Sequence, residues 1–317
     1  VNIRGRIIRF IYGLARHRIK QAVEDRNMTS GQNMRGKICL VTGATSGIGK
    51  VTAAALAAQG AGVVIVGRNL QKTHAVVQQI REETGNDSVH YLLADFSDLE
   101  RVREIAANFK KRYSRLDVLV NNAGTYFNTR QETSYGVEAT FLVNHLASFL
   151  LTNLLLELMQ NSTPARIVNV SSNAHHYGTM DLNDLEFKRF YFGFWAYARS
   201  KLANILFTYE LSHRLHGSGV TVNALHPGEV ATDIFKTNCP VIGPLFKWIV
   251  GRFALTPEQG ADNTIYLASS PEVEGVTGKY FVKRQAIASA PISYDEKLAQ
   301  QVWDFSEKIT SIGLTQN

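Results

Sequence analysis

Short apolar runs alternate with longer segments of helical periodicity along most of the chain. Seven runs rich in β-branched and other apolar residues predict strands at Ile38–Thr42, Gly62–Gly67, Val89–Ala94, Asp117–Asn121, Arg166–Ser171, Thr221–Leu225 and Gly278–Val282. Helical spacing is clearest in Val51–Gln59 and Phe141–Met159. The strands are apolar throughout instead of alternating with polar residues, as is typical of a parallel sheet covered on both faces. The pattern predicts an α/β fold, a doubly wound parallel sheet of the Rossmann type with helices on both faces.

No internal repeat, low-complexity tract or Pro/Ser-rich linker divides the chain after its first 35 residues. A chain of 317 residues buries roughly three quarters of its unfolded surface, so one large core is available. We therefore expect a single domain over residues 35–317, preceded by an arm over residues 1–34. No stretch approaches the ~18 to 20 consecutive apolar residues of a simple membrane-spanning helix.

The charge is unevenly distributed. The net charge is +7, and the first 35 residues hold eight basic residues against two acidic ones, which leaves only +1 on the rest. A nucleic-acid enzyme carries basic surface on its folded body as well, so we expect no nucleic-acid partner. The only cysteines are Cys39, inside a predicted buried strand, and Cys239, so neither a disulfide framework nor a zinc site is expected. This usage favours a reducing compartment, and we expect a cytoplasmic protein.

The arm places Ile8, Ile11, Ala15 and Ile19 at helical spacing among Arg and Lys residues. A basic amphipathic helix is typical of peripheral contact with anionic lipid, and the alternative is a helix that packs on its own domain. Arg9 interrupts what would be the apolar region of a signal peptide, whereas an organellar presequence stays open.

A glycine-rich turn joins the first strand to the first helix of the domain. Gly43, Gly47 and Gly49 let the backbone turn tightly and approach a pyrophosphate, which meets the N–H groups of the helix start. Such turns also occur for packing reasons, but the position after the first strand of an α/β pattern favours a dinucleotide. The second strand ends at Gly67 and is followed by Arg68 instead of an acidic residue. Because a guanidinium pairs with a 2′-phosphate, NADP(H) is the expected cofactor.

Tyr197 and Lys201 lie four residues apart in a predicted helix, Trp195–Arg214, and so share one face. An ammonium near a phenol favours the phenolate, which makes the tyrosine a proton donor and acceptor for carbonyl reduction or alcohol oxidation. A Tyr and a Lys four residues apart usually form a surface pair, so this pair indicates catalysis only in combination with other motifs. Ser171 and Ser172 end one strand, where ligands of open α/β sheets bind.

Together these motifs resemble the short-chain dehydrogenase/reductase family over about residues 36–283. The resemblance rests on TGATSGIG (42–49), NNAG (121–124), Asn144, Ser172, YARSK (197–201) and HPGEVAT (226–232). It implies a general acid/base role for Tyr197, and for Lys201 a role in lowering the tyrosine pKa and holding the nicotinamide ribose. Ser172 would orient the substrate oxygen, since the serine of this branch stands 25 residues before the tyrosine, and Asn144 would hold a water that links Lys201 to solvent. The other cofactor contacts implied by the family motifs are Ser46 and Ile48 at the phosphates, Asp95 and Phe96 at the adenine, Asn122 at the ribose, Val230 and Thr232 at the carboxamide, and Ala123, Gly124, Pro227 and Gly228.

More narrowly, residues 144–157, 165–178, 197–215 and 277–281 resemble the retinol dehydrogenase branch. The resemblance implies an NADP(H)-dependent oxidoreductase that interconverts a lipophilic alcohol and its aldehyde or ketone, with a homo-oligomer as one assembly. Glu229 departs from this branch, which commonly has an apolar residue after Pro-Gly, and the basic arm departs from the apolar anchors of membrane-bound relatives. The alternative function is a cofactor-binding scaffold or sensor without turnover. A sugar-nucleotide epimerase is disfavoured by its longer substrate domain and different glycine spacing.

Three further features have two readings each. His175-His176 lack the additional ligands of a metal site and are expected to be ordinary loop histidines. Residues 233–256 contain an apolar stretch that is either a packed helix or a lid over an apolar substrate. The aromatic residues just before Tyr197 add either a substrate wall or core, and they are Tyr191, Phe192, Phe194 and Trp195.

Overall fold

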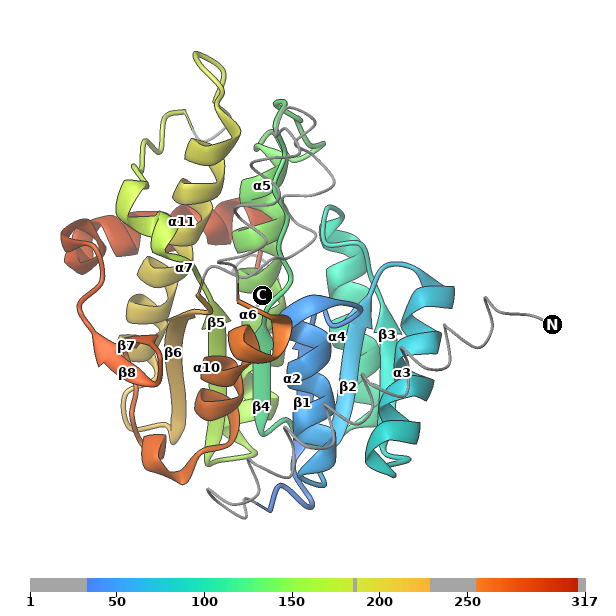
Figure 1. The fold of residues 1–317 in the computed structure, drawn as a ribbon. Coiled ribbons are helices and arrows are strands. Elements are labelled where there is room, and N and C mark those ends of the chain that lie inside the picture. The colour runs from blue at the N-terminus through green and yellow to red at the C-terminus, as the bar shows by residue number, and fades with distance from the viewer. Residues whose placement is uncertain (1–32, 185–186, 229–254, 313–317) are drawn as a thin grey trace.

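The computed structural model describes residues 33–184, 187–228 and 255–312, and in them eight strands form one sheet (Figure 1). The spatial order is β3-β2-β1-β4-β5-β6-β7-β8, and every neighbouring pair is parallel except β7 and β8. The strands are β1 (Ile38–Thr42), β2 (Gly62–Gly67), β3 (Val89–Leu93), β4 (Val118–Asn121), β5 (Ala165–Val170), β6 (Val220–His226), β7 (Lys279–Val282) and β8 (Gln285–Ile287). The doubly wound fold predicted from the apolar runs is confirmed.

Helices cover both faces of this sheet. Helices α2, α3 and α10 pack on one face, and α4, α6, α7 and α11 pack on the other. The helices and short turns are α2 (Gly47–Ala58), α3 (Leu70–Thr84), α4 (Leu99–Arg112), α5 (Ala139–Phe141), the π-helix η1 (Leu142–Leu146), α6 (Ala147–Gln160), η2 (Asn173–Tyr177), α7 (Gly193–Arg214), α10 (Pro257–Ser269), η3 (Pro271–Val273), η4 (Pro291–Tyr294) and α11 (Glu296–Thr310).

Two buried clusters explain why the strands read as continuous apolar runs. Successive side chains of a strand point to opposite faces, so Cys39 and Val41 pack with α2 and α10 while Leu40 packs on the other face. β1, β2 and β4 are buried on both faces, and their sequences are therefore almost wholly apolar. Met34 is already part of this core, and its N–H donates to the carbonyl of Gln59 at 2.9 Å.

Local signals fix several helix ends. Asn69 caps α3 by accepting from the N–H of Lys72, and Gly85 ends it in the left-handed region at φ 67°. Thr256 and Gln259 form a capping box at the start of α10, with Pro257 at its first position. Local capping residues therefore fix both ends of α3 and the start of α10.

The structure differs from the sequence expectations in two elements. The short antiparallel strand β8 was not expected, because it is exposed throughout and lacks an apolar run. The expected helix Phe141–Met159 begins at Ala139 and is interrupted by η1, so the turn that carries Asn144 is wider than an α-helical turn. By length and composition Ala139–Gln160 would span a membrane, but 78% of its most apolar window is buried inside the fold, which marks a core helix among the described residues.

Candidate active site

The glycine-rich turn lies between the carboxyl end of β1 and α2. Gly43 and Gly47 adopt the left-handed region at φ 64° and φ 55°, and a Cβ on Gly43 would lie 2.7 Å from the Cα of Ala123. The N-cap Ser46 makes no side-chain capping bond, and the first turn of α2 holds no acidic residue. The first-turn N–H groups and the positive end of the helix dipole therefore fit a phosphate group.

Thr42 and Asn122 tie this turn to the loop after β4. The hydroxyl of Thr42 accepts from the backbone N–H groups of Asn122 and Ala123, both at 3.0 Å. The Asn122 amide donates to the carbonyls of Thr42 at 2.8 Å and Gly43 at 3.2 Å, and a Cβ on Gly49 would collide with that amide. The glycines thus serve the packing of the turn, and their approach to a ligand stays a prediction.

Arg68, Asp95 and Phe96 lie together because β2 and β3 are neighbours. The N–H of Ala94 donates to the carbonyl of Gly67 at 3.1 Å, which places the two strand ends side by side. Arg68 is exposed at the end of β2, Asp95 is exposed and accepts from both the N–H and the hydroxyl of Ser97, and Phe96 is buried. The expected adenine and 2′-phosphate residues therefore share one edge of the sheet.

Asn144 occupies the middle of the π-helix η1. Its carbonyl oxygen accepts from the N–H of Thr125 at 2.7 Å, and its amide donates to the carbonyl of Thr125 and to the Ser200 hydroxyl, both at 3.0 Å. The side chain is almost wholly buried. These three bonds join the loop after β4 to helix α7.

Lys201 and Tyr197 share the face of α7 that their spacing predicts. The Lys201 ammonium lies 5.5 Å from the centroid of the Tyr197 ring and donates to the carbonyl of Val170 at 3.0 Å. A Cβ on Gly124 would lie 3.5 Å from Asn144 Oδ1 and 3.7 Å from Lys201 Nζ, so the three expected residues meet at this loop. Burial lowers the pKa of Lys201 from its ordinary value to about 8.

The two serines after β5 have different surroundings. The Ser171 hydroxyl is buried and donates to the carbonyl of Lys201 at 2.8 Å, which makes it part of the helix support. Ser172 is partly exposed, and its hydroxyl accepts from the N–H of Ala174 at 3.2 Å, which leaves its own proton for another acceptor. Ser171 thus supports α7, whereas Ser172 is partly exposed to solvent.

His175 supports this serine loop, a role that the sequence did not indicate. The histidine lies in the short helix η2 instead of a loop, and it is fully buried. Its Nδ1 lies 2.7 Å from the carbonyl of Ser172, and its Nε2 accepts from the N–H of Ala290 at 3.0 Å. Burial lowers its pKa to about 4, so it is neutral at pH 7. Its only sequence signal is its place three residues after Ser172.

The end of β6 carries the remaining cofactor residues. Pro227 and Gly228 follow the strand, with Gly228 at φ 90° against Leu255. Glu229, Val230 and Thr232 lie outside the described residues, as does the expected lid 233–256 except for Leu255 and Thr256. The arm over residues 1–34 also lies outside them except for Asn33 and Met34.

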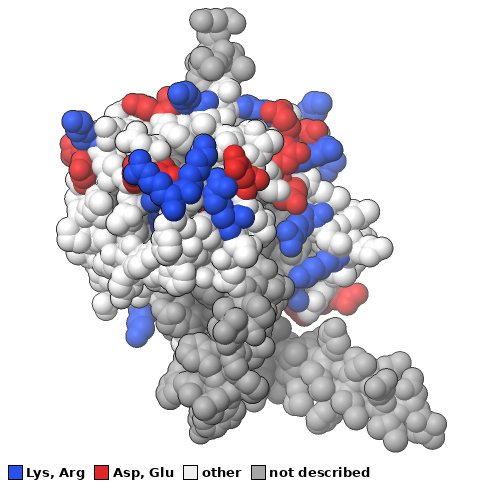
Figure 2. Space-filling model, turned by 90° about the horizontal axis from the view of Figure 1, so that it is seen from above, with Lys and Arg blue, Asp and Glu red and all other residues white. Residues whose placement is uncertain are grey.

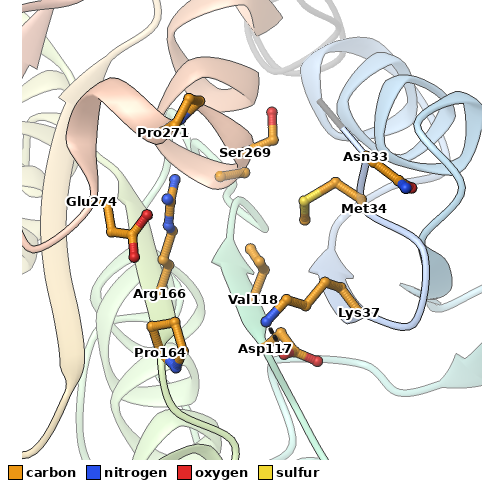
Figure 3. A pocket seen from close by; sticks show the side chains of 11 residues that line it. Asn33, Met34, Lys37, Asp117, Val118, Pro164, Arg166, Ser269, Pro271 and Glu274 are labelled. Carbon is orange, nitrogen blue, oxygen red and sulfur yellow. Dashed lines mark ion pairs between the residues drawn. The ribbon is translucent and has the colours of Figure 1, made fainter. Parts of the chain in front are cut away.

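A cavity of about 330 Å³ lies at the opposite edge of the sheet (Figure 3). Lys37, Asp117 and Arg166 line it from the amino ends of β1, β4 and β5, and Lys37 pairs with Asp117 at 3.0 Å. None of the expected site residues lines this cavity. The chemistry-bearing side chains gather at the carboxyl ends of the strands, as expected for an open α/β sheet.

Comparison with known proteins agrees with this geometry. The family model for short chain dehydrogenases matches residues 37–240. Mouse (Mus musculus) retinol dehydrogenase 14 is 43% identical over 291 residues, which cover 88% of this chain and 87% of the relative. Human (Homo sapiens) polyprenol dehydrogenase is 40% identical over 285 residues, covering 87% of this chain and 86% of the relative.

Solved structures show the same relationship. An uncharacterized protein of Mycobacterium paratuberculosis superposes with a TM-score of 0.73 at 32% identity, covering 88% of this chain and 95% of the other. A short chain dehydrogenase of Shigella flexneri 2a, solved in complex with NADP, gives a TM-score of 0.64 at 26% identity, covering 80% and 98%. The chain therefore belongs to the short-chain dehydrogenase/reductase family of oxidoreductases and resembles its retinol dehydrogenases.

Proposed function

We propose that this chain is an NADP(H)-dependent oxidoreductase that interconverts a lipophilic alcohol and its aldehyde or ketone. The observation that carries the proposal is the meeting of Asn144, Lys201 and Gly124 beside the Tyr197 ring, at the edge where the uncapped helix α2 begins. A phosphate site and a proton-transfer group on one sheet edge are the two requirements of nicotinamide chemistry.

The cofactor is held along the carboxyl edge of the sheet. The first turn of α2 binds the pyrophosphate, with Ser46, Gly47 and Ile48 at the phosphates. Arg68 pairs with the 2′-phosphate, since its exposed guanidinium makes no ion pair within the described part of the chain. The loop after β4 and the Lys201 ammonium bind the ribose on the nicotinamide side.

The nicotinamide, when bound, supplies or accepts the hydride at the carbinol carbon. In the reductive direction Tyr197 gives the proton from its phenolic oxygen to the substrate oxygen, and in the oxidative direction it takes that proton back. Ser172 donates a hydrogen bond that orients the substrate oxygen. Lys201 stabilises the Tyr197 phenolate, and Asn144 holds the loop after β4 against α7 through its three hydrogen bonds.

The lipophilic substrate is supported by two observations. The relatives reported above are named for retinol and polyprenol, both long apolar alcohols. The segment that enters α7 is rich in aromatic residues, among them Phe192 and Trp195, which are half exposed close to Tyr197. A cofactor-binding scaffold without turnover is the alternative function.

Turnover separates the two functions. NADPH oxidation is measured with retinal, a long isoprenoid aldehyde and a small soluble aldehyde. The Tyr197→Phe variant should lose a factor of at least about 100 in kcat while its NADPH affinity stays within about twofold, because the hydroxyl moves the proton and does not anchor the cofactor. Tight NADPH binding without turnover of any aldehyde would favour the scaffold, and a variant with wild-type kcat would remove Tyr197 from its role.

A further inference from the structure

A group of aromatic rings is exposed where the chain enters α7. We call it the aromatic tip and define it as Tyr177, Phe190, Phe192, Phe194 and Trp195. The exposed fractions are 72% for Phe190, 60% for Tyr177, 50% for Phe192 and 42% for Trp195. Ring centroids link Tyr177 to Phe194 at 5.7 Å and Phe194 to Trp195 at 5.3 Å. Large apolar side chains that gather on a surface in this way mark an interaction site.

The segment behind the aromatic tip is firmly attached. Tyr191 turns inward, and its hydroxyl donates to the carbonyl of Phe127 at 2.7 Å. Phe187 is buried beneath the guanidinium of Arg199, which lies 3.8 Å from its ring centroid and donates to the carbonyls of Thr179 and Asp184. Inward residues thus anchor the segment while Phe190 and Phe192 point outward. The exposed rings are presented by a fixed support.

Charged residues of both signs accompany this segment, and the Asp184 carboxylate accepts from the backbone N–H of Lys188 at 2.8 Å. Lys188 and Arg189 are exposed immediately before Phe190. The acids Asp181 and Asp184 act on the buried Arg199, where they oppose the lowering of its pKa by burial, and Glu186 lies outside the described residues. The exposed guanidinium of Arg189 beside the rings therefore complements an anionic surface.

The aromatic tip also adjoins the candidate active site. Trp195 stands two residues before Tyr197 on α7, and the segment projects beyond the carboxyl edge of the sheet in Figure 1. Seen from above that edge, basic side chains stand next to acidic ones and beside a broad area without charged residues (Figure 2). Aromatic rings flanked by Lys and Arg are typical of segments that lie in the interface between lipid headgroups and acyl chains.

We propose that the aromatic tip inserts into the interfacial region of a bilayer that contains anionic lipid, and so holds the active-site edge against the membrane. The benefit rests on the proposed function, because a lipophilic substrate dissolved in the bilayer then reaches the site without crossing water. The contact itself depends only on the exposed rings and their neighbouring cations.

Vesicle co-sedimentation of the full chain tests the contact. Phosphatidylcholine vesicles with and without phosphatidylserine are compared at low and at high salt. High salt screens the charges of both the arm and the aromatic tip, so it isolates the contribution of the rings. The partition coefficient of the double variant Phe190→Ser/Phe192→Ser should be lower than that of wild type by a factor of at least about ten. The reason is that two exposed rings no longer leave water. Ile287→Ser is the matched control, because Ile287 is 45% exposed on the edge strand β8 and should not change partitioning.

A second measurement locates the contact at one indole. Lipids brominated on their acyl chains quench tryptophans that enter the bilayer, and part of this quenching should disappear in Trp195→Phe. Unchanged quenching in that variant, or wild-type partitioning of the double variant, would overturn the proposal. A changed oligomeric state of the double variant without vesicles would instead make the aromatic tip a contact between copies of the chain. Wild-type turnover of the aldehyde panel is scored separately, so the proposed function and the membrane contact fail independently.

Discussion

At the scale of single residues, Arg68 carries the proposed preference for NADP(H) over NAD(H). It stands directly after β2, beside the end of β3. In the proposed binding mode the 2′-phosphate on the adenosine ribose lies at this place. A carboxylate at this place binds a free 2′-hydroxyl and repels a 2′-phosphate, whereas a guanidinium does the opposite.

The Arg68→Asp variant should therefore shift preference from NADPH toward NADH. The ratio of kcat/KM for the two cofactors should fall by roughly 10- to 100-fold, because a charge-assisted hydrogen bond of about 1.5 to 3 kcal/mol is replaced by repulsion. Arg112→Asp, an exposed arginine in the last turn of α4, is the control and should leave the ratio unchanged. A wild-type preference for NADH would contradict the assignment of Arg68 before any substitution.

Residue types indicated the candidate site where the proposed chemistry demands a particular group. Glycines with positive φ, a Tyr and Lys four apart and an Arg after the second strand are visible in the sequence because few alternatives serve. The different surroundings of Ser171 and Ser172 depend on which way each hydroxyl points, which residue type does not fix. His175 was missed for the same reason, since its partner Ala290 is 115 residues away.

At the scale of elements, a buried histidine joins three helices beside the candidate catalytic residues. His145 lies in η1 next to Asn144, its Nδ1 is 3.3 Å from Asn204 on α7, and its Nε2 is 2.9 Å from the Ser306 hydroxyl on α11. The Asn204 atom is its amide oxygen, which only accepts, so Nδ1–H of the neutral imidazole donates to it. The Ser306 hydroxyl lies within hydrogen-bond distance of both Nε2 and the carbonyl of Val302.

Burial lowers the pKa of His145 to about 4, which makes stability depend on pH. Between about pH 6.5 and 4 the unfolded chain binds a proton that the folded chain does not, so stability falls as pH falls through this range. The loss from this group is about 2 kcal/mol at about pH 5. Thermal melting at about pH 7 and pH 5 should show a smaller pH-dependent drop for His145→Gln than for wild type.

The exposed His213 of α7 supplies the control variant His213→Gln, which also replaces one imidazole by an amide. His175 and His226 also have pKa values lowered to about 4 by burial, so part of the drop should persist in His145→Gln. An identical drop in wild type and His145→Gln would contradict the assignment.

Element boundaries were predictable where the period was strong. β1 and β2 have their expected bounds, since both faces of each strand are buried. The π-helix was not predictable, because the apolar residues of Ala139–Gln160 satisfy an α-helical period on either side of it. The interruption is decided by the bonds of Asn144 and His145 to distant elements.

At the scale of the whole molecule, the candidate catalytic groups and most of the net charge lie in different parts of the chain. Every candidate catalytic group lies at the carboxyl edge of the sheet, the cavity with its Lys37–Asp117 pair lies at the amino edge, and most of the net charge lies in the arm. Cytoplasmic residence with peripheral membrane contact through the arm stays a prediction. The apolar pattern predicted the general fold. It did not predict the order of the strands in the sheet, which decides which distant segments meet at the carboxyl edge.

Removing residues 1–32 while keeping the buried Met34 should weaken binding to anionic vesicles at low salt. Each basic residue near an anionic surface contributes on the order of 1 kcal/mol, and this contribution is screened by salt. Turnover of a small soluble aldehyde should persist, because all proposed catalytic groups lie beyond the arm. Vesicle co-sedimentation at low and high salt, with thermal melting of both proteins, checks this. Unchanged vesicle binding with a large drop in melting temperature would mean that the arm packs on the domain.

The π-helix at Leu142–Leu146 has a genetic consequence. A π turn accommodates one residue more than an α turn, so loss of a single codon there leaves enough residues for an uninterrupted helix. The apolar stripe of α6 would keep its place on the sheet, while Asn144 would rotate by about 100° away from Thr125 and Ser200. The glycine-rich turn would be untouched. We therefore predict that one in-frame deletion in η1 removes the proposed turnover while the fold and the proposed dinucleotide site stay in place.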